Sequence, residues 1–233
     1  MVPTLILGTR NAHKAQEIKA ILSEKYSYLT LKDFPAAPTT VEDGKTFVSN
    51  AMKKSIELAK WLSATPEPPQ HSCVLADDSG LEVDALNGAP GVYSARFAAL
   101  DRDNHQNSSD AENNAKLLRL LHDVPAERRQ ARFRCVLALT PILETATTAS
   151  PVCYVDAFEI QTQLFEGTCE GSIAFHAAGS GGFGYDPLFV PDGFKQSLAE
   201  LGEDVKNQIS HRSKALSNLR RHLGLSNFLI ADL

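Results

Sequence analysis

The sequence has few cysteines, no long hydrophobic run and no excess of basic residues. Its four cysteines stand singly, and none forms the Cys-x-x-Cys pair of a zinc or redox site: Cys73, Cys135, Cys153 and Cys169. No apolar run approaches the ~20 residues of a membrane-spanning helix. The first eight residues also lack the basic leader and the apolar length of a signal peptide. We therefore expect free thiols in a reducing compartment, which favours a cytoplasmic location without a membrane partner.

The net charge and the length of the chain further limit the class of protein. A formal net charge of −5 argues against nonspecific binding to nucleic acid. A chain of 233 residues, of which 43% are hydrophobic and 22% charged, has the composition of an ordinary globular enzyme. It is long enough for one large domain or two small lobes with a substantial core.

An acidic segment follows a short apolar run in the first half of the chain. Cys73 to Ala76 has the length and content of a buried strand, and we expect that strand to end at Asp77 and Asp78. Adjacent like charges resist burial, and a cation would relieve the repulsion. Carboxylate oxygens suit Mg²⁺ or Mn²⁺. The alternative is a tight turn, since Asp, Ser and Gly all favour turns.

Two segments upstream carry polar groups at predicted helix starts. A strand over Thr4 to Leu7 leads through Gly8–Lys14 into a helix, where free backbone N–H groups would suit a phosphate chain. The alternative is a plain link in which Asn11 caps the helix. Thr46 would cap a second helix from Phe47, with acidic residues Glu42 and Asp43 just before it. These either complement the helix dipole or supply a ligand to a metal shared with the acidic segment.

The middle of the chain predicts a helix and a pair of strands. Ser109 to Glu112 is a capping box, and the helix that it opens should turn Ala111, Ala115, Leu118 and Leu121 inward. Ala131 to Leu139 alternates like a strand, and Val152 to Phe165 is its expected antiparallel partner. Between them, Glu144 to Ser150 is expected to form an exposed hairpin tip.

The last third combines a glycine-rich loop with basic residues. Gly179 to Pro187 contains G-x-G-x-x-G, but Pro187 and the dense glycines oppose the helix that this motif must open, so the dinucleotide interpretation is rejected. The loop suits a flat aromatic ligand, whereas the alternative is a turn that packs its own aromatics. The basic residues after it would complete a nucleoside triphosphate pocket opposite an acidic metal site, or else belong to a solvated helix: Lys206, His211, Arg212 and Lys214.

Taken together and in order, these segments resemble the HAM1/RdgB family of inosine and xanthosine triphosphate pyrophosphatases, in its bacterial form. The resemblance runs from Leu5 to about Leu223 and rests on six motifs: Thr9–Lys14, Glu42–Phe47 with Asn50-Ala51, Ala76–Leu81, Gly88–Gly91 with Ser94–Arg96, Gly181–Pro187 and Ser210–Arg212.

This resemblance implies an α/β fold of the two-lobed ITPase-like type, in which one domain over residues 1–233 forms two lobes around a long mixed sheet. It implies an active site in the cleft between the lobes, and a homodimer. The implied reaction is metal-dependent hydrolysis of ITP, dITP and XTP to the monophosphate and pyrophosphate, which clears deaminated purines. Two alternatives stay open: a Maf-like pyrophosphatase for other bases, and a nucleotide-binding sensor without turnover.

The resemblance also assigns roles by position. Asp78 is the proton acceptor. Asp78 and Glu42 together bind Mg²⁺, for which Mn²⁺ is a possible substitute. The phosphates and sugar are assigned to Thr9, Arg10, Asn11, Ala12, His13, Lys14, Ser79 and Lys206. The base is assigned to Phe183, Gly184, Tyr185, Asp186, His211 and Arg212. Arg10 and His13 are bulkier than is common in the family, which implies a narrower phosphate loop.

Overall fold

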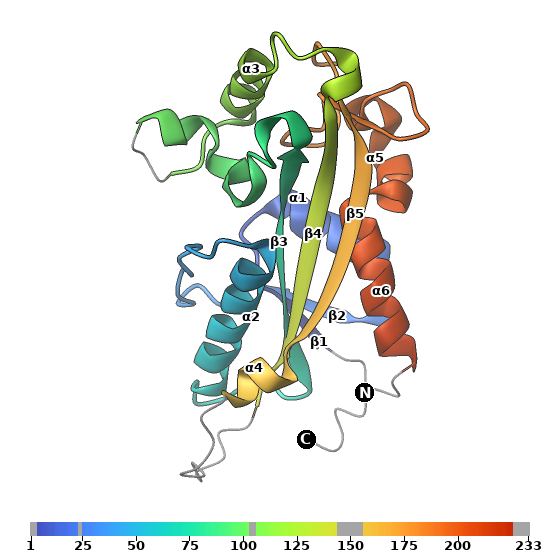
Figure 1. Ribbon diagram of the computed structural model, residues 1–233. Coiled ribbons are helices and arrows are strands. Elements are labelled where there is room, and N and C mark those ends of the chain that lie inside the picture. Colours follow the sequence, from blue (N-terminus) through green and yellow to red (C-terminus); the bar gives the residue numbers. More distant parts are fainter. Residues whose placement is uncertain (1–3, 23–24, 103–105, 144–155, 226–233) are drawn as a thin grey trace. The chain divides into compact units, whose positions relative to one another are not determined.

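The structure is a computed structural model that describes residues 4–22, 25–102, 106–143 and 156–225. Six strands form one mixed sheet in the order β2-β1-β3-β4-β5-β6 (Figure 1). β1 pairs in parallel with β2 and β3, whereas β5 and β6 are antiparallel. The strands are β1 (Thr4–Leu7), β2 (Ser27–Thr30), β3 (Ser72–Val83), β4 (Gln130–Pro141), β5 (Gln163–Ile173) and β6 (Phe189–Pro191). The expected α/β class with a mixed sheet is confirmed.

Six α-helices accompany the described strands: α1 (Ala12–Leu22), α2 (Phe47–Ser63), α3 (Asp110–Leu120), α4 (Ala157–Gln161), α5 (Leu198–Ile209) and α6 (His211–Leu225). Short 3₁₀ helices include η3 (Gly91–Arg96), η4 (Ala98–Arg102) and η5 (Ala126–Arg128). Within the described ranges, no helix has the length and apolar content needed to cross a membrane.

The chain divides into two compact units. The first comprises Met1–Asp78, Val136–Glu166 and Ala215–Leu233, and the second comprises Ser79–Cys135 and Gly167–Lys214. Each of β3, β4, β5 and α6 therefore contributes residues to both units. The boundary within β3 falls between Asp78 and Ser79, so the two adjacent carboxylates, Asp77 and Asp78, both belong to the first unit.

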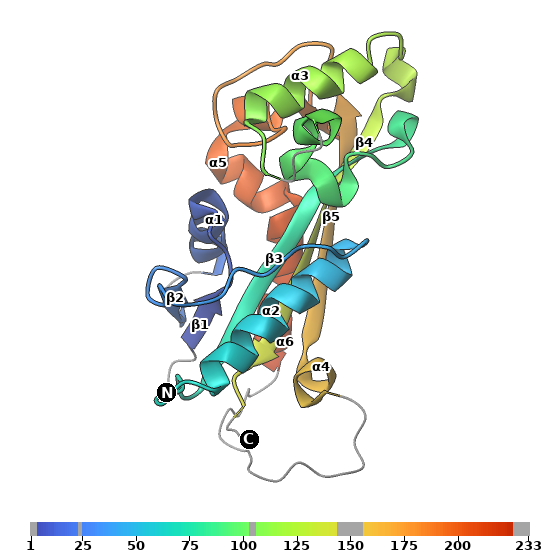
Figure 2. The same ribbon diagram turned by 90° about the vertical axis from the view of Figure 1, so that its left-hand side faces the viewer.

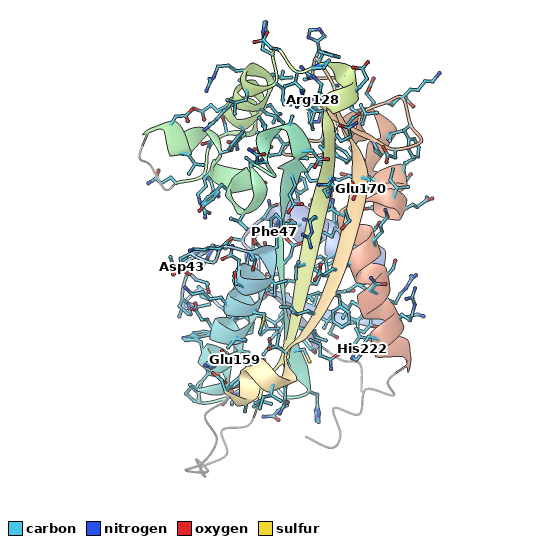
Figure 3. All side chains as sticks on the ribbon, viewed as in Figure 1. Asp43, Phe47, Arg128, Glu159, Glu170 and His222 are labelled. Carbon is cyan, nitrogen blue, oxygen red and sulfur yellow. The ribbon has the colours of Figure 1, made fainter. Side chains whose placement is uncertain are left out.

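The first unit has an apolar core between its sheet strands and α2. Ile6, Val74, Leu58 and Leu62 are fully or almost fully buried there. The predicted cap of α2 is confirmed, because the Thr46 hydroxyl accepts a hydrogen bond from the Ser49 N–H at 3.1 Å. Figure 3 shows where this helix starts, with Phe47 in its first turn. The cap fixes where the polar side chains of α2 project.

The second unit has its own core, and here the inward face of α3 differs from the prediction. The capping box of Ser109 and Glu112 is confirmed. Leu121 is buried and Leu118 packs against this core, as predicted, but Ala111 and Ala115 are exposed, and Asn113, Lys116 and Leu117 are buried as well. Burial is tolerated because both polar side chains bond to the backbone. Asn113 Oδ1 accepts from Ala98 N at 2.8 Å, and the Lys116 ammonium donates to Phe97 O at 2.7 Å.

The predicted strand over Val152 to Phe165 is wrong for residues 156–162 and correct for residues 163–165, which begin β5 beside β4 in the sheet. Asp156 accepts a hydrogen bond from Phe158 N at 3.0 Å, which caps α4, and β5 begins only at Gln163. A side-chain cap therefore starts a helical turn where alternation predicted a strand. The predicted hairpin tip at Glu144 to Ser150 lies outside the described residues.

Arg129 offers a stability test for the second unit. Its guanidinium is buried and donates to the carbonyl oxygens of Leu121, Val124 and Ala174 at 2.6, 2.9 and 3.0 Å. Arg129→Met would leave three carbonyls without their donor, so we expect the free energy of unfolding to fall by about 3 kcal/mol in urea titrations. The control is Arg128→Met, an exposed neighbour whose loss should cost less than about 0.5 kcal/mol (Figure 3). Equal losses in both variants would contradict this role.

Candidate active site

Two adjacent carboxylates lie in the middle of β3, and not at its end. The strand runs without interruption through Asp77, Asp78, Ser79 and Gly80, so the predicted strand end and the alternative turn are both wrong. The side chains of Asp77 and Asp78 are buried. Buried charges need partners, and each of these carboxylates has one.

The pleat of the strand sends the two carboxylates to opposite faces. Lys14 of α1 forms an ion pair with Asp77, and Lys54 of α2 approaches Asp78 Oδ1 to 2.9 Å. Consistent with this, α1 and α2 lie on opposite sides of β3 (Figure 2). The ion pairs allow the strand to continue through two charges that would otherwise repel.

Asp78 lies in a network of charges and hydrogen bonds. Besides Asp78, the Lys54 ammonium contacts Glu42 Oε2 at 3.3 Å, and the amide of Asn50 donates to Asp78 Oδ2 at 3.2 Å. Burial raises the pKa of the Asp78 carboxyl, while Lys54 and Lys14 oppose the rise. Burial also disfavours the charged form of Lys54, but Asp78 and Glu42 more than compensate and raise its pKa. We call Glu42, Asn50, Lys54 and Asp78 the acidic cluster.

The acidic cluster fits a cation that binds together with a ligand. Glu42 and Asp78 reach the same ammonium, so their oxygens converge on one cationic group. Within the described ranges, no group of three or more His, Cys, Asp or Glu side chains is arranged to hold a metal ion. Mg²⁺ commonly takes only one or two carboxylates and completes its shell with water and phosphate oxygens. Two carboxylates therefore suit Mg²⁺ with a phosphate ligand better than an all-protein cage.

The Gly8–Lys14 segment is organised by its own side chains. Thr9 Oγ1 accepts from Asn11 N at 3.1 Å, and Asn11 Oδ1 accepts from Lys14 N at 3.2 Å. Asn11 thus caps α1, as the alternative interpretation proposed, and Ala12 and His13 form its first turn. Arg10 extends toward the Ala37 carbonyl, with Nη2 at 3.3 Å. A phosphate-binding role for this segment stays a prediction.

A second group of charges surrounds the glycine-rich loop. The Lys206 ammonium lies 2.7 Å from Asp186 Oδ2, and both side chains are buried. The same carboxylate oxygen accepts from Phe183 N at 2.9 Å, and the Lys206 ammonium lies 4.5 Å from the Phe183 ring centroid. Asp186 therefore holds the loop and its lysine together. Lys206, assigned to phosphate and sugar by resemblance, lies beside the loop assigned to the base.

Tyr185 and Gly184 anchor this loop to the rest of the second unit. Tyr185 is buried in the core, burial raises the pKa of its phenol, and its hydroxyl donates to Ser94 O at 2.9 Å. Gly184 N donates to Asp110 Oδ2 at 2.6 Å, and Gly184 O accepts from Asn114 Nδ2 at 3.0 Å. The alternative of a loop that packs its own aromatic side chain thus holds for Tyr185. Phe183 is only partly buried.

His211 and Arg212, at the start of α6, are buried, so the alternative of a solvated helix is wrong for them, whereas Lys214 is exposed and fits that alternative. Arg212 is 1% exposed, donates to Ser79 Oγ at 2.8 Å, and lies 5.9 Å from the Phe183 ring centroid. His211 stacks on Phe133 with ring centroids 4.8 Å apart and planes 13° apart. We call Ser79, Phe183, Lys206 and Arg212 the aromatic–basic cluster.

Sequence reasoning missed several of these partners. Lys54 was not singled out, and Asn50 entered only as part of a motif. The two residues are four apart on α2 and both reach Asp78. Asp110 and Asn114 are likewise four apart on α3 and both hold Gly184. Polar pairs at this spacing share a helix face, so this periodicity is the signal that could have identified them.

The fold and the two clusters define an α/β protein in which each buried aspartate of the site forms an ion pair with a lysine. The family model of the Ham1 family matches residues 5–222, and the chain belongs to the Ham1 family. A dITP/XTP pyrophosphatase of Desulforamulus reducens is 45% identical over 213 residues, which cover 91% of each chain. One of Exiguobacterium sibiricum is 46% identical over 221 residues, covering 94% of this chain and 96% of the relative.

Solved structures agree with this membership. The Staphylococcus aureus Ham1 protein matches with a TM-score of 0.74 and 34% identity, covering 96% of this chain and 100% of that one. A nucleoside-triphosphatase / dITP/XTP pyrophosphatase of Mycobacterium abscessus matches with a TM-score of 0.67 and 36% identity, covering 93% and 98%. The likeness thus extends over nearly the whole chain.

The Lys206–Asp186 pair yields a prediction about loop stability. Lys206→Met would leave the buried Asp186 carboxylate without its cation, and we expect a loss of about 3–5 kcal/mol in the free energy of unfolding. Combining it with Asp186→Asn removes that charge and should recover part of the loss. Lys195→Met, at an exposed position nearby in the chain, is the control. Urea unfolding of all three variants provides the measurement, and a double variant that is less stable than Lys206→Met would refute the pairing.

Proposed function

We propose that this chain is a dITP/XTP pyrophosphatase that hydrolyses ITP, dITP and XTP to the monophosphate and pyrophosphate. Its role is to clear deaminated purines from the nucleotide pool. The observation that carries the proposal is the convergence of Glu42 and Asp78 on Lys54. It occurs in a chain 45% identical to a dITP/XTP pyrophosphatase over 91% of its length.

The acidic cluster supports hydrolysis at the α-phosphorus. A water oxygen bonds to this phosphorus, its proton passes to Asp78, and the bond to the bridging oxygen breaks, so that pyrophosphate leaves with the electron pair. A buried carboxylate with a raised pKa is suited to accept that proton. Glu42 and Asp78 would hold Mg²⁺, which when bound spreads the phosphate charge. Lys54 and Lys14 supply further positive charge close by.

The aromatic–basic cluster supports selection of the base. Hypoxanthine and xanthine offer a 6-oxo acceptor beside an N1–H donor, whereas adenine offers the reverse pair. A donor from Arg212 or His211 to the 6-oxo group would be left unpaired against adenine, at a cost of about 1–3 kcal/mol. Phe183 would stack on the ring. Guanine shares the 6-oxo group, so its 2-amino group must be disfavoured elsewhere.

The remaining assignments belong to the same proposal. The Thr9–Lys14 segment and Ser79 would bind the phosphates and sugar, and Lys206 and Asp186 would hold the base loop in place. The homodimer rests on the family resemblance, and the cytoplasmic location rests on the singly placed cysteines of the sequence. Sedimentation analysis and cell fractionation test them.

The experiment that tests the function is a substrate panel with Mg²⁺. Pyrophosphate release is measured from ITP, dITP, XTP, GTP and ATP, with and without excess EDTA. We expect rapid release from the first three only, and none with EDTA. Pyrophosphate release from a nucleotide with a different base would support a Maf-like specificity. Binding of ITP without any release would support a nucleotide sensor, and either result would overturn the proposal.

Asp78→Asn should abolish turnover without unfolding the protein. The amide keeps the shape of the carboxylate but cannot accept a proton or give a metal a full charge, so kcat should fall by about a hundredfold or more. Asp77→Asn is the matched control, because Asp77 faces Lys14 on the other side of β3, and it should cost less. Circular dichroism checks the fold. Activity within about tenfold of the original, a barrier change of roughly 1.4 kcal/mol, would refute the role of Asp78.

Arg212→Ala tests base selection. If Arg212 donates to the 6-oxo group, kcat/KM should fall much more for ITP than for ATP, and the gap between them should shrink by about 1–3 kcal/mol. Arg221→Ala, at an exposed position further along α6, controls for the loss of a charge. An unchanged ratio of kcat/KM for ITP to kcat/KM for ATP would mean that Arg212 contacts the phosphates and not the base.

A further inference from the structure

Asn50 is a fully buried polar residue that the proposed chemistry leaves without a role. It lies in the first turn of α2, and none of its surface is exposed. A buried amide needs hydrogen bonds to offset its desolvation, and those of Asn50 lead in two directions. One goes to the backbone before α2, and the other goes to β3.

The two bonds fix the orientation of the amide. Gly44 N donates to Asn50 Oδ1 at 2.8 Å, and a backbone N–H can only meet the oxygen of the amide. The nitrogen must then face the carboxylate, and Asn50 Nδ2 donates to Asp78 Oδ2 at 3.2 Å. One rigid side chain thus connects the segment that carries Glu42 to Asp78. The other oxygen of Asp78 faces Lys54.

Gly44 shows how closely this segment lies against Asn50. A Cβ at position 44 would overlap both Ser49 Oγ and Asn50 Oδ1. Charged side chains also join this segment to α2, Lys53 to Asp43 at 2.7 Å and Lys54 to Glu42 at 3.3 Å. The first is solvent-exposed and therefore contributes little. The second involves an ammonium that also binds Asp78. Asn50 supplies the buried, uncharged attachment.

We propose that Asn50 is a positioning residue for the divalent cation. By bonding Gly44 and Asp78 at once, it keeps the Glu42 carboxylate at the distance from Asp78 at which both share one ion. It touches neither the substrate nor the reacting atoms. The inference rests on the proposed function, because the shared cation is part of that function.

The first test uses the protein alone. In Asn50→Ala the Gly44 amide loses its acceptor, so its hydrogen exchange should accelerate by about tenfold or more. Ser49→Ala is the matched control, since it perturbs the neighbouring cap of α2 but leaves both Asn50 bonds in place. Unchanged exchange of the Gly44 amide in Asn50→Ala, or equal acceleration in both variants, would overturn the inference whether or not the enzyme is active.

The second test measures the cation. Binding of Mn²⁺, followed by its electron paramagnetic resonance signal, should weaken by about tenfold in Asn50→Ala and remain near the original in Ser49→Ala. The Mg²⁺ concentration for half-maximal activity should rise in parallel, while KM for ITP at saturating Mg²⁺ stays near the original. A lower kcat at saturating Mg²⁺ with unchanged Mn²⁺ binding would mean that Asn50 acts elsewhere, and would overturn the inference.

Gly44→Ala provides a second variant should Asn50→Ala fold poorly. It alters no side chain of the acidic cluster, yet it displaces the segment from Asn50. We expect the same loss of Mn²⁺ affinity, and the double variant should lose no more than either single one, because both break one connection. Additive losses would overturn the inference. Absence of Mg²⁺-dependent pyrophosphate release from the unmodified enzyme would instead refute the proposed function.

Discussion

The burial of two neighbouring carboxylates inside one strand is the constraint on which the first unit depends. Asp77 and Asp78 can remain charged within β3 only because cations approach from both faces of the strand, Lys14 on one and Lys54 on the other. The helices that carry these lysines must therefore keep their register. The caps at Asn11 and Thr46 fix where those helices begin, and so where the ammonium groups lie.

The second unit uses the same principle for a different purpose. Asp186 and Lys206 are buried as a pair, and their contact fixes a loop that presents a partly exposed aromatic ring. Tyr185, in the middle of the glycine-rich loop, packs in the core and donates its hydroxyl hydrogen bond to Ser94 O. The glycine-rich loop is thus held in place by side-chain bonds that its composition does not reveal. In the proposed function, a loop held in this way would discriminate between bases because it would not rearrange to satisfy the wrong one.

Local features of this chain were predictable, and long-range pairings were not. β1 occupies the predicted residues, and Thr46 and Ser109 cap the predicted helices, because these depend on neighbours in sequence. The acidic segment was expected to end its strand because its partners are distant: Lys14 is 63 residues from Asp77, and Lys54 is 24 residues from Asp78. The inward face of α3 includes Leu118 and Leu121 as predicted, but it also includes Asn113 and Lys116, because these side chains bond to the backbone of Ala98 and Phe97.

The family assignment explains why six short motifs, each weak alone, could identify a fold. Motif order fixes the topology, but it does not say which side chains meet. Only the structure joins Asn50 to Asp78 and separates Tyr185 from Phe183. The residues assigned by resemblance therefore fall into two groups: those that belong to a charged cluster, and those that hold such a cluster in place.

The central claim is that the acidic cluster directs water to the α-phosphorus of the nucleotide. Turnover of ITP in water labelled with ¹⁸O, followed by mass spectrometry of both products, tests this most directly. The account predicts one labelled oxygen in the monophosphate and none in pyrophosphate. Label in pyrophosphate would mean attack at the β-phosphorus, and label in released orthophosphate would mean attack at the γ-phosphorus. Either result would contradict the account.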